Sequence, residues 1–170
     1  MVNGKDKFGA QFIVNSQLAG VSGYKIYFDS NLNVNLVEPD IALAQFKGAR
    51  PCWSDAYSPA GYVFPLGVLN LHGVSVKPGG FLQGDAAVIQ TIYQDTKGAL
   101  CEFGVSLIDS RATAIAKLPD VDDKVLVVWQ TEELIPIDGI AYGIELPADL
   151  RFRITSALLV LAIQNPADIK

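Results

Sequence analysis

Three short segments of the sequence carry the side chains best suited to bind a small molecule: residues 54–62, 83–87 and 109–111. Each follows a stretch that reads as a strand and precedes a stretch that reads as a helix. The start of a helix offers unpaired backbone N–H groups and a partial positive charge. Three such starts brought together would hold an anion without a lysine-rich loop.

Hydroxyl, guanidinium and carboxyl groups accompany these backbone donors. Ser58 and Ser110 can donate hydrogen bonds, and the Arg111 guanidinium can bind an oxyanion through two parallel hydrogen bonds. Asp85 and Asp109 fit an anion site in two ways: a carboxylate can accept the proton of a monoprotonated phosphate or phosphonate, or pair with an ammonium on an aminoalkyl ligand. The residues expected to form the site are Tyr57, Ser58, Ala60, Gly61, Tyr62, Gly84, Asp85, Asp109, Ser110 and Arg111.

The same residues also have ordinary structural interpretations. Asp85 and Asp109 stand where helix N-caps are common, and an arginine in a first helical turn is usually solvated. Trp53 and Trp129 are typical of a hydrophobic core rather than of a binding platform. These interpretations stay open on the sequence alone.

The sequence contains few residues suited to catalysis or to metal binding. His72 is the only histidine, and Cys52 and Cys101 have no metal-ligand spacing, so neither a metal nor a cofactor is expected. G-x-S-x-G, phosphate-loop lysine and H-E-x-x-H motifs are absent from the sequence, which argues against an enzyme. The two cysteines either pair in an oxidising compartment or remain two buried thiols.

The elements that must position these residues alternate between strand and helix. Residues 8–14 read as a strand, and residues 23–28 and 33–37 read as a hairpin. Further strands are expected at 49–53, 81–83, 101–108, 125–129 and 139–144, and helices ending at 71 and spanning 86–94, 110–117 and 147–163. The alternation predicts an α/β fold with a mostly parallel sheet flanked by helices, whose ligand lies at the carboxyl ends of the strands.

Composition excludes several classes of partner. The chain has 170 residues, of which half are apolar, and a net charge of −5 without a basic stripe, so nucleic acid and anionic membranes are not expected to bind. The longest apolar run, residues 157–163, is shorter than the ~18 residues that span a bilayer and reads as a buried helix. The first seven residues lack the apolar run of a signal peptide.

Several motifs follow one another in a recognisable order: FKGAR at 46–50, SPAGY at 58–62 with Pro65, GDAAVI at 84–89, and FGV at 103–105 with DSR at 109–111. This order resembles the phosphate/phosphonate-type periplasmic binding proteins of ABC importers. IPID at 135–138 and LPADL at 146–150 look like that family's return crossing and closing helix. The resemblance covers residues 8–163.

The resemblance implies a type II periplasmic-binding fold, in which two α/β lobes close on a small anionic solute. It also implies a membrane permease as partner and an extracytoplasmic location. The family's ligand loop is Ser-Thr-Ser-Gly-Tyr-like. The corresponding loop here keeps Ser58 but has Pro59 and Ala60 at the next two positions, so two side-chain donors are lost.

The chain is short for such a protein, and much of the first lobe is missing from the resemblance. We expect residues 1–45 to be part of the first lobe, residues 46–129 to form the second, ligand-binding lobe, and residues 130–170 to return to the first. Such a partial lobe would leave apolar surface uncovered, which predicts a homo-oligomer or a fragment. A ligand-sensing or structural domain that has lost transport, and an enzyme acting on a phosphorylated substrate, are the alternatives.

Overall fold

The computed structural model describes residues 7–115, 117–136 and 142–164 of the chain. The chain divides into two compact units. The first, Lys7–Ile135, is called the sheet unit, and the second, which begins at Pro136 in this part of the chain, is called the C-terminal unit. The expected boundary after residue 45 concerned lobes, and the compact units do not test it. The assignment of segments to two lobes stays a prediction.

Five strands form the main sheet in the order β6-β5-β7-β2-β8. β5 pairs in parallel with β6 and β7, whereas β2 runs antiparallel to both β7 and β8. Four strands therefore run in one direction and β2 alone runs against them, so the sheet is mixed but mostly parallel, as expected. The strands are β1 (Lys7–Phe8), β2 (Ala10–Asn15), β3 (Phe28–Asp29), β4 (Val34–Asn35), β5 (Pro51–Trp53), β6 (Gly80–Phe81), β7 (Phe103–Leu107), β8 (Val125–Gln130) and β9 (Ile135–Pro136).

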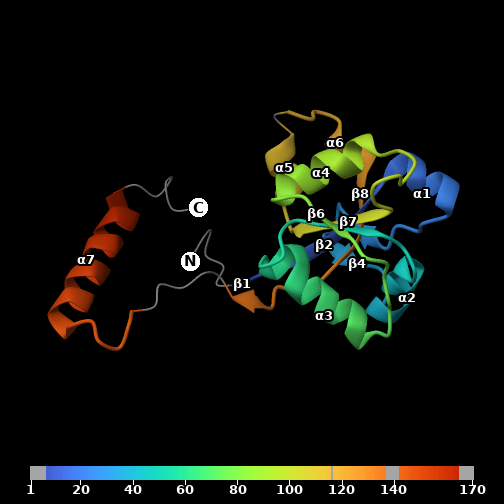
Figure 1. The fold of residues 1–170 in the computed structure, drawn as a ribbon. Coiled ribbons are helices and arrows are strands. Elements are labelled where there is room, and N and C mark those ends of the chain that lie inside the picture. Colours follow the sequence, from blue (N-terminus) through green and yellow to red (C-terminus); the bar gives the residue numbers. More distant parts are fainter. Residues whose placement is uncertain (1–6, 116, 137–141, 165–170) are drawn as a thin grey trace. The chain divides into compact units, whose positions relative to one another are not determined.

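Helices cover both faces of this sheet. The helices α4, α5 and α6 lie on one face, and α2 and α3 lie on the other (Figure 1). The helical elements are α1 (Ser16–Ser22), α2 (Pro39–Leu43), η1 (Ala44–Phe46), η2 (Pro59–Val63), α3 (Phe64–Leu71), α4 (Asp85–Gln94), α5 (Ser110–Ala114), α6 (Val121–Lys124) and α7 (Ala148–Gln164).

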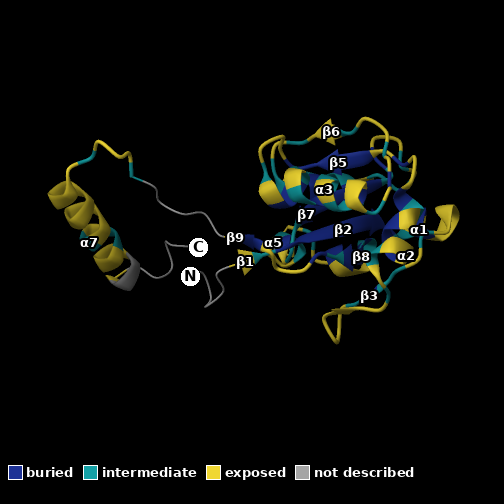
Figure 2. Ribbon diagram, turned by 90° about the horizontal axis from the view of Figure 1, so that it is seen from below, coloured by how far each residue is buried: buried dark blue, intermediate teal, exposed yellow. Residues whose placement is uncertain are grey.

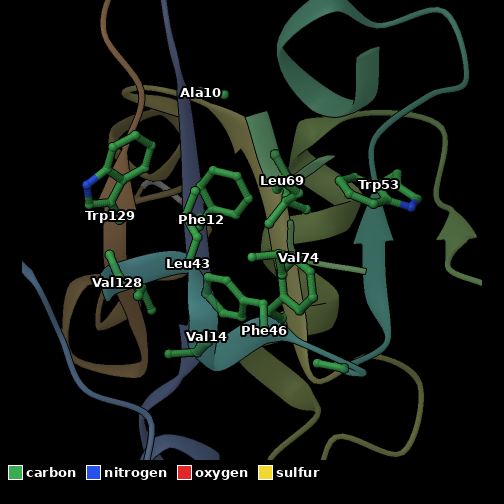
Figure 3. Packing of buried hydrophobic residues seen from close by; sticks show 14 of the residues in the cluster. Ala10, Phe12, Val14, Leu43, Phe46, Trp53, Leu69, Val74, Val128 and Trp129 are labelled. Atoms are coloured by element: carbon green, nitrogen blue, oxygen red, sulfur yellow. The ribbon is translucent and has the colours of Figure 1, made fainter. Parts of the chain in front are cut away.

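Two hydrophobic clusters form because successive side chains of a strand point to opposite faces. Phe12 of β2 packs in the cluster beneath α2 and α3, with Phe46 and Phe103 stacked at ring-centroid distances of 5.7 and 6.4 Å. Figure 3 shows part of this cluster. Ile13 packs in the opposite cluster, together with Val88 of α4. All of β2 is buried, as its dark blue colour in Figure 2 shows.

The N-terminal part of the sheet unit differs most from expectation. Of residues 23–28, which were predicted to form a strand, only Phe28 lies in one, and the unpredicted helix α1 precedes this segment. The Asn15 side chain caps α1 by accepting bonds from Gln17 N and Leu18 N, and Gly23 ends it in the left-handed conformation. The predicted hairpin is real but short, since only Phe28–Asp29 pairs with Val34–Asn35.

Neither Asp85 nor Asp109 caps a helix through its side chain. Gly84 is the N-cap of α4 and Asp85 is its first residue, so the Asp85 side chain is free for another partner. Asp109 stands at the N-cap of α5 with a φ of 70°, and its side chain makes no capping bond. Pro65 lies in the first turn of α3, which begins at Phe64 directly after the π-helical turn η2.

A disulfide joins Cys52 of β5 to Cys101, which precedes β7. The two sulfur atoms lie in the cluster beneath α4, where both cysteines are buried. This decides between the two interpretations of the cysteines in favour of pairing.

The described part of the C-terminal unit consists mainly of α7. This helix was expected at 147–163, and the structure confirms it with a shift of one residue. Its expected burial is wrong: Phe152, Leu159 and Val160 are at least half exposed, because the described part of the unit contains no second helix to cover them. Among the described residues, no helix has both the length and the hydropathy to cross a bilayer.

Candidate functional site

The carboxyl ends of β5, β6 and β7 lie side by side, and each leads into a helical element. The residues at these ends are called the rim here: Ser54, Ser58, Gly61, Gly84, Asp85, Leu107 and Ser110. Because the strands are parallel neighbours, their carboxyl ends meet at one edge of the sheet. The three segments singled out in the sequence therefore come together, as expected for an open α/β sheet.

Ser54 connects the first two segments through its backbone. Its N–H donates to the Gly61 carbonyl at 3.3 Å, and its carbonyl accepts from the Gly84 N–H at 2.9 Å. Its side chain is buried, and the hydroxyl Oγ has no hydrogen-bond partner of normal geometry among the described residues. A buried hydroxyl without a hydrogen bond is uncommon, and here the Asp85 carboxyl lies nearby.

Gly61 allows this connection because it has no side chain. A Cβ atom at Gly61 would lie 1.5 Å from Ser54 Oγ and 2.9 Å from Ser58 Oγ. The two serine hydroxyls therefore both crowd the backbone of the first turn of η2. Only glycine permits this approach.

Ser58 is the N-cap of η2. Its Oγ accepts a bond from the Gly61 N–H at 2.9 Å, which leaves its own hydrogen available to donate. Its carbonyl accepts from both Tyr62 N and Val63 N, and the second of these bonds makes the turn π-helical.

Asp85 and Leu107 connect the second segment to the third. Asp85 Oδ1 accepts the Leu107 N–H at 3.3 Å, and the Ser110 hydroxyl donates to the Leu107 carbonyl. Burial raises the pKa of the Asp85 carboxyl above its ordinary value, while the Leu107 N–H and the nearby Ser54 side chain act in the opposite direction. A carboxyl with a raised pKa is suited to share a proton with a ligand.

Backbone strain concentrates at the same corner. Gln83 has a φ of 64° and Gly84 a φ of 135°, the latter a conformation that favours glycine. Such strain is often found at binding sites, where the surrounding structure holds it in place.

The other predicted residues have different surroundings. Asp109 and Arg111 line a cavity of about 160 Å³ whose lining includes Gln11 and Gln130 but neither Ser58 nor Asp85. The Arg111 Nη1 donates to the Val125 carbonyl at 2.7 Å and lies 3.3 Å from an Asp122 carboxyl oxygen. Burial lowers the pKa of Arg111, and Asp122 opposes that shift. The guanidinium thus has structural partners, and its expected grip on an anion beside Ser58 stays a prediction.

Three further predicted site residues, Tyr57, Ala60 and Tyr62, lie in the first segment. The Tyr57 side chain is 90% exposed, whereas Ala60 is buried in the core. The Tyr62 ring packs edge-on against Trp53 and Phe81 at centroid distances of 5.3 and 4.9 Å. Tyr62 therefore supports the rim through packing.

Sequence reasoning placed Ser54 in the first segment but not among the site residues. Its position directly after β5 was the available signal, because the first residue beyond a parallel strand faces the binding edge. Leu107 offered no side-chain signal, since only its backbone is used.

A model of the family described as periplasmic phosphonate substrate-binding proteins of ABC transporters matches residues 1–169. A search among curated proteins found no match.

Solved structures resemble the chain in fold. PhnD1 from Prochlorococcus marinus, in complex with methylphosphonate, is 20% identical with a TM-score of 0.55, and the match covers 76% of this chain and 43% of that one. A binding-protein component of an ABC phosphonate transporter from Pseudomonas aeruginosa is 15% identical with a TM-score of 0.57, covering 91% and 45%. An ancestral arginine-binding protein bound to arginine is 17% identical with a TM-score of 0.54, covering 95% and 57%. The chain thus spans about half the length of these proteins.

Proposed function

This chain belongs to the phosphonate-binding family of periplasmic substrate-binding proteins of ABC transporters, and we propose that it binds a small oxyanion of the phosphate or phosphonate class at the rim. Its fold is that of the type II periplasmic-binding proteins, with the mostly parallel sheet expected from the sequence. The family consists of transport components rather than enzymes.

The observation that carries the proposal is the continuous connection of the three strand ends through Ser54 and Leu107. It brings the N-termini of η2 and α4 to one edge, where backbone N–H groups attract negative charge. The buried Ser54 hydroxyl lies near the Asp85 carboxyl without a hydrogen bond of normal geometry, and the Ser58 hydroxyl keeps a hydrogen to donate. An oxyanion placed there would accept the bond from Ser58.

Asp85 defines the protonation state that the site prefers. A carboxylate repels a fully ionised anion but accepts a hydrogen bond from a monoprotonated phosphate or phosphonate. A ligand without that proton leaves the Asp85 carboxyl unpaired, which provides selectivity. Asp85 thereby favours a monoprotonated ligand, or one that carries an ammonium group.

The remaining features of the importer role are part of the same proposal. We infer binding without chemical turnover, a membrane permease as partner, and an extracytoplasmic location. The buried Cys52–Cys101 disulfide supports that location, because disulfides persist in oxidising compartments.

A binding experiment tests the proposal. Isothermal titration calorimetry with phosphate, phosphite, methylphosphonate and aminoethylphosphonate should give saturable heat for at least one ligand, and mass spectrometry should recover that ligand unchanged. Ser58→Ala should weaken binding by about tenfold or more, since it removes one hydrogen bond to a charged group. Ser22→Ala, at the exposed end of α1, is the matched control and should bind like the unaltered protein.

The alternative is a ligand-sensing or structural domain that has lost transport. Pro59 and Ala60, which lack hydroxyls, favour it, because they remove side-chain donors from the first turn of η2. Absence of heat with every ligand of the panel would support this alternative over the importer role. Equal binding by Ser58→Ala would show that the ligand lies elsewhere.

A further inference from the structure

Helix α7 carries an exposed apolar stripe between two basic side chains. Phe152 and Leu159 are both more than half exposed, and their spacing of seven residues, about two turns, places them on one face of the helix. These two side chains are called the α7 stripe. Arg151 and Arg153 are the chain neighbours of Phe152, and each is turned from it by about 100° around the helix axis. The arginines therefore flank the stripe on both sides.

The two arginines make this end of α7 positive, and both are exposed. Arg153 has no hydrogen-bond or ion-pair partner among the residues that the structure describes. Arg151 donates only to the carbonyls of Leu146 and Ile144, which do not neutralise its charge. Asp149 is the only acidic residue of the helix. The α7 stripe therefore suits an apolar surface that carries carboxylates.

The sheet unit contains an apolar cavity of about 430 Å³. Seven of its twelve lining residues are apolar. Phe64 and Val68 contribute from one face of α3, and Leu36 and Leu134 are more than half exposed, so the apolar lining is accessible from solvent. The α3 residues place the cavity on the α2–α3 side of the sheet, whereas α4, α5 and α6 lie on the other side (Figure 1). It is called the α3 cavity here.

The residues that line the α3 cavity are also acidic. Glu38 comes from the β4–α2 connection and Glu132 follows β8, and both are exposed, so a partner can reach them from solvent. The lining includes neither lysine nor arginine, and its histidine, His72, is paired with Asp40. The α3 cavity thus combines apolar surface with negative charge, which complements the apolar and positive character of the α7 stripe.

We propose that α7 of one copy of this chain docks in the α3 cavity of a second copy. The α7 stripe packs against the apolar lining, and the two flanking arginines pair with Glu38 and Glu132. Each copy offers one helix and one cavity, so two copies can exchange helices and close into a symmetric pair with two identical contacts. The lining includes none of Ser54, Ser58 or Asp85, so the contact is independent of the rim.

Reversing the charges on the two surfaces tests the contact. The cavity variant carries Glu38→Lys and Glu132→Lys, and the helix variant carries Arg151→Glu and Arg153→Glu. In analytical ultracentrifugation, each variant alone should self-associate at least about tenfold more weakly than the unaltered protein, because like charges then face each other. An equal mixture of the two should recover association, because the positive cavity of one accepts the negative helix of the other, and the reverse pair is also matched.

A control variant and three outcomes decide the test. Asp123→Lys, on α6 across the sheet, changes the net charge elsewhere and should leave association unchanged. If the cavity variant associates like the unaltered protein, α7 packs on another surface, such as a second α7, and the proposal is wrong. A mixture that stays monomeric, or an unaltered protein that is monomeric at every concentration, would also overturn it. Recovery in the mixture shows that both variants are folded.

Photo-crosslinking identifies the two surfaces directly. In an equal mixture of nitrogen-14 and nitrogen-15 protein, p-benzoylphenylalanine in place of Phe152 should give mixed-isotope cross-links to peptides that contain Leu36 or Leu134. The same group in place of Leu161 lies on the opposite face of α7, nine residues along, and should give several-fold fewer. Cross-links confined to chains of one isotope would mean that the helix binds its own chain, which would refute docking between copies.

Discussion

At the scale of single residues, the rim depends on close approaches that only particular side chains allow. Gly61 lies so near Ser54 Oγ that even a methyl group has no room. Asp85 is held partly buried at the start of α4 by the backbone of Leu107. Both features have measurable consequences.

Gly61→Ala should lower the free energy of unfolding by about 1–3 kcal/mol, because the added Cβ would overlap Ser54 Oγ. Thermal unfolding followed by circular dichroism measures the change. Gly67→Ala is the control: a Cβ there meets nothing within 4 Å, so this helical alanine should be neutral or stabilising by up to about 1 kcal/mol. Adding Ser54→Gly to Gly61→Ala should restore part of the loss, and failure to do so would refute the crowding argument.

Asp85→Asn should become increasingly stabilising, relative to the unaltered protein, as the pH rises. Burial raises the pKa of Asp85 in the folded state, so its ionisation costs folding free energy that is absent below the ordinary aspartate pKa of ~4. Stability is therefore lost as pH rises through the raised pKa, and asparagine, which does not titrate, avoids that loss. Urea unfolding of both proteins from pH 4 to 8 measures the difference, and a constant difference across that range would contradict it.

At the scale of elements, the disulfide connects the strand that precedes the first rim segment to the strand that precedes the third. Cys52 lies in β5, and Cys101 lies just before β7, its parallel neighbour. The bond therefore joins two strands whose carboxyl ends form the rim. The disulfide therefore affects the rim by holding β5 and β7 together, and not by contacting the rim residues.

Replacing both cysteines by alanine should lower the free energy of unfolding by about 2–4 kcal/mol. The reason is the entropy that the unfolded chain regains when a loop spanning 49 positions is opened. Denaturant midpoints of the variant and of the unaltered protein, with and without reducing agent, measure the effect. If reducing agent leaves the unaltered protein's midpoint unchanged, the bond contributes nothing to stability.

The elements also show where sequence patterns are limited. The strands 8–14, 49–53 and 125–129 were predicted from their short apolar runs, and β2, β5 and β8 overlap them. Helix α1 was missed because its segment contains glycine and lacks a clear apolar stripe, although Asn15 and Gly23 mark its two ends. Tertiary contacts with the sheet stabilise α1 despite its weak propensity.

At the scale of the whole molecule, the sheet unit has its own cores, while the described part of the C-terminal unit exposes apolar side chains. Phe152 is 73% exposed and Leu159 is 60% exposed on α7. A contiguous patch of such side chains would be uncommon on an isolated soluble chain. The homo-oligomer expected from the sequence stays a prediction, and these residues are where it should form.

Analytical ultracentrifugation over a range of concentrations should show reversible self-association of the protein. The double variant Phe152→Ser and Leu159→Gln should weaken it, because burying these side chains drives the association. Val21→Ser, an equally exposed apolar position on α1, should have no effect. A monomer at every concentration would contradict the prediction.

The sequence by itself determined the α/β class, the family and the three segments of the rim. Alternating apolar runs and glycine or proline signals depend only on residues that are neighbours in the chain, so they can be read without the structure. It also indicated that Ser58 and Asp85 belong near a ligand, which stays a prediction. Only the tertiary structure decided that Ser54 and Leu107 connect those segments, that Arg111 faces Asp122, and that the two cysteines pair. These features depend on which strands become neighbours and on which face each side chain points to, and contacts between residues far apart in the chain settle both.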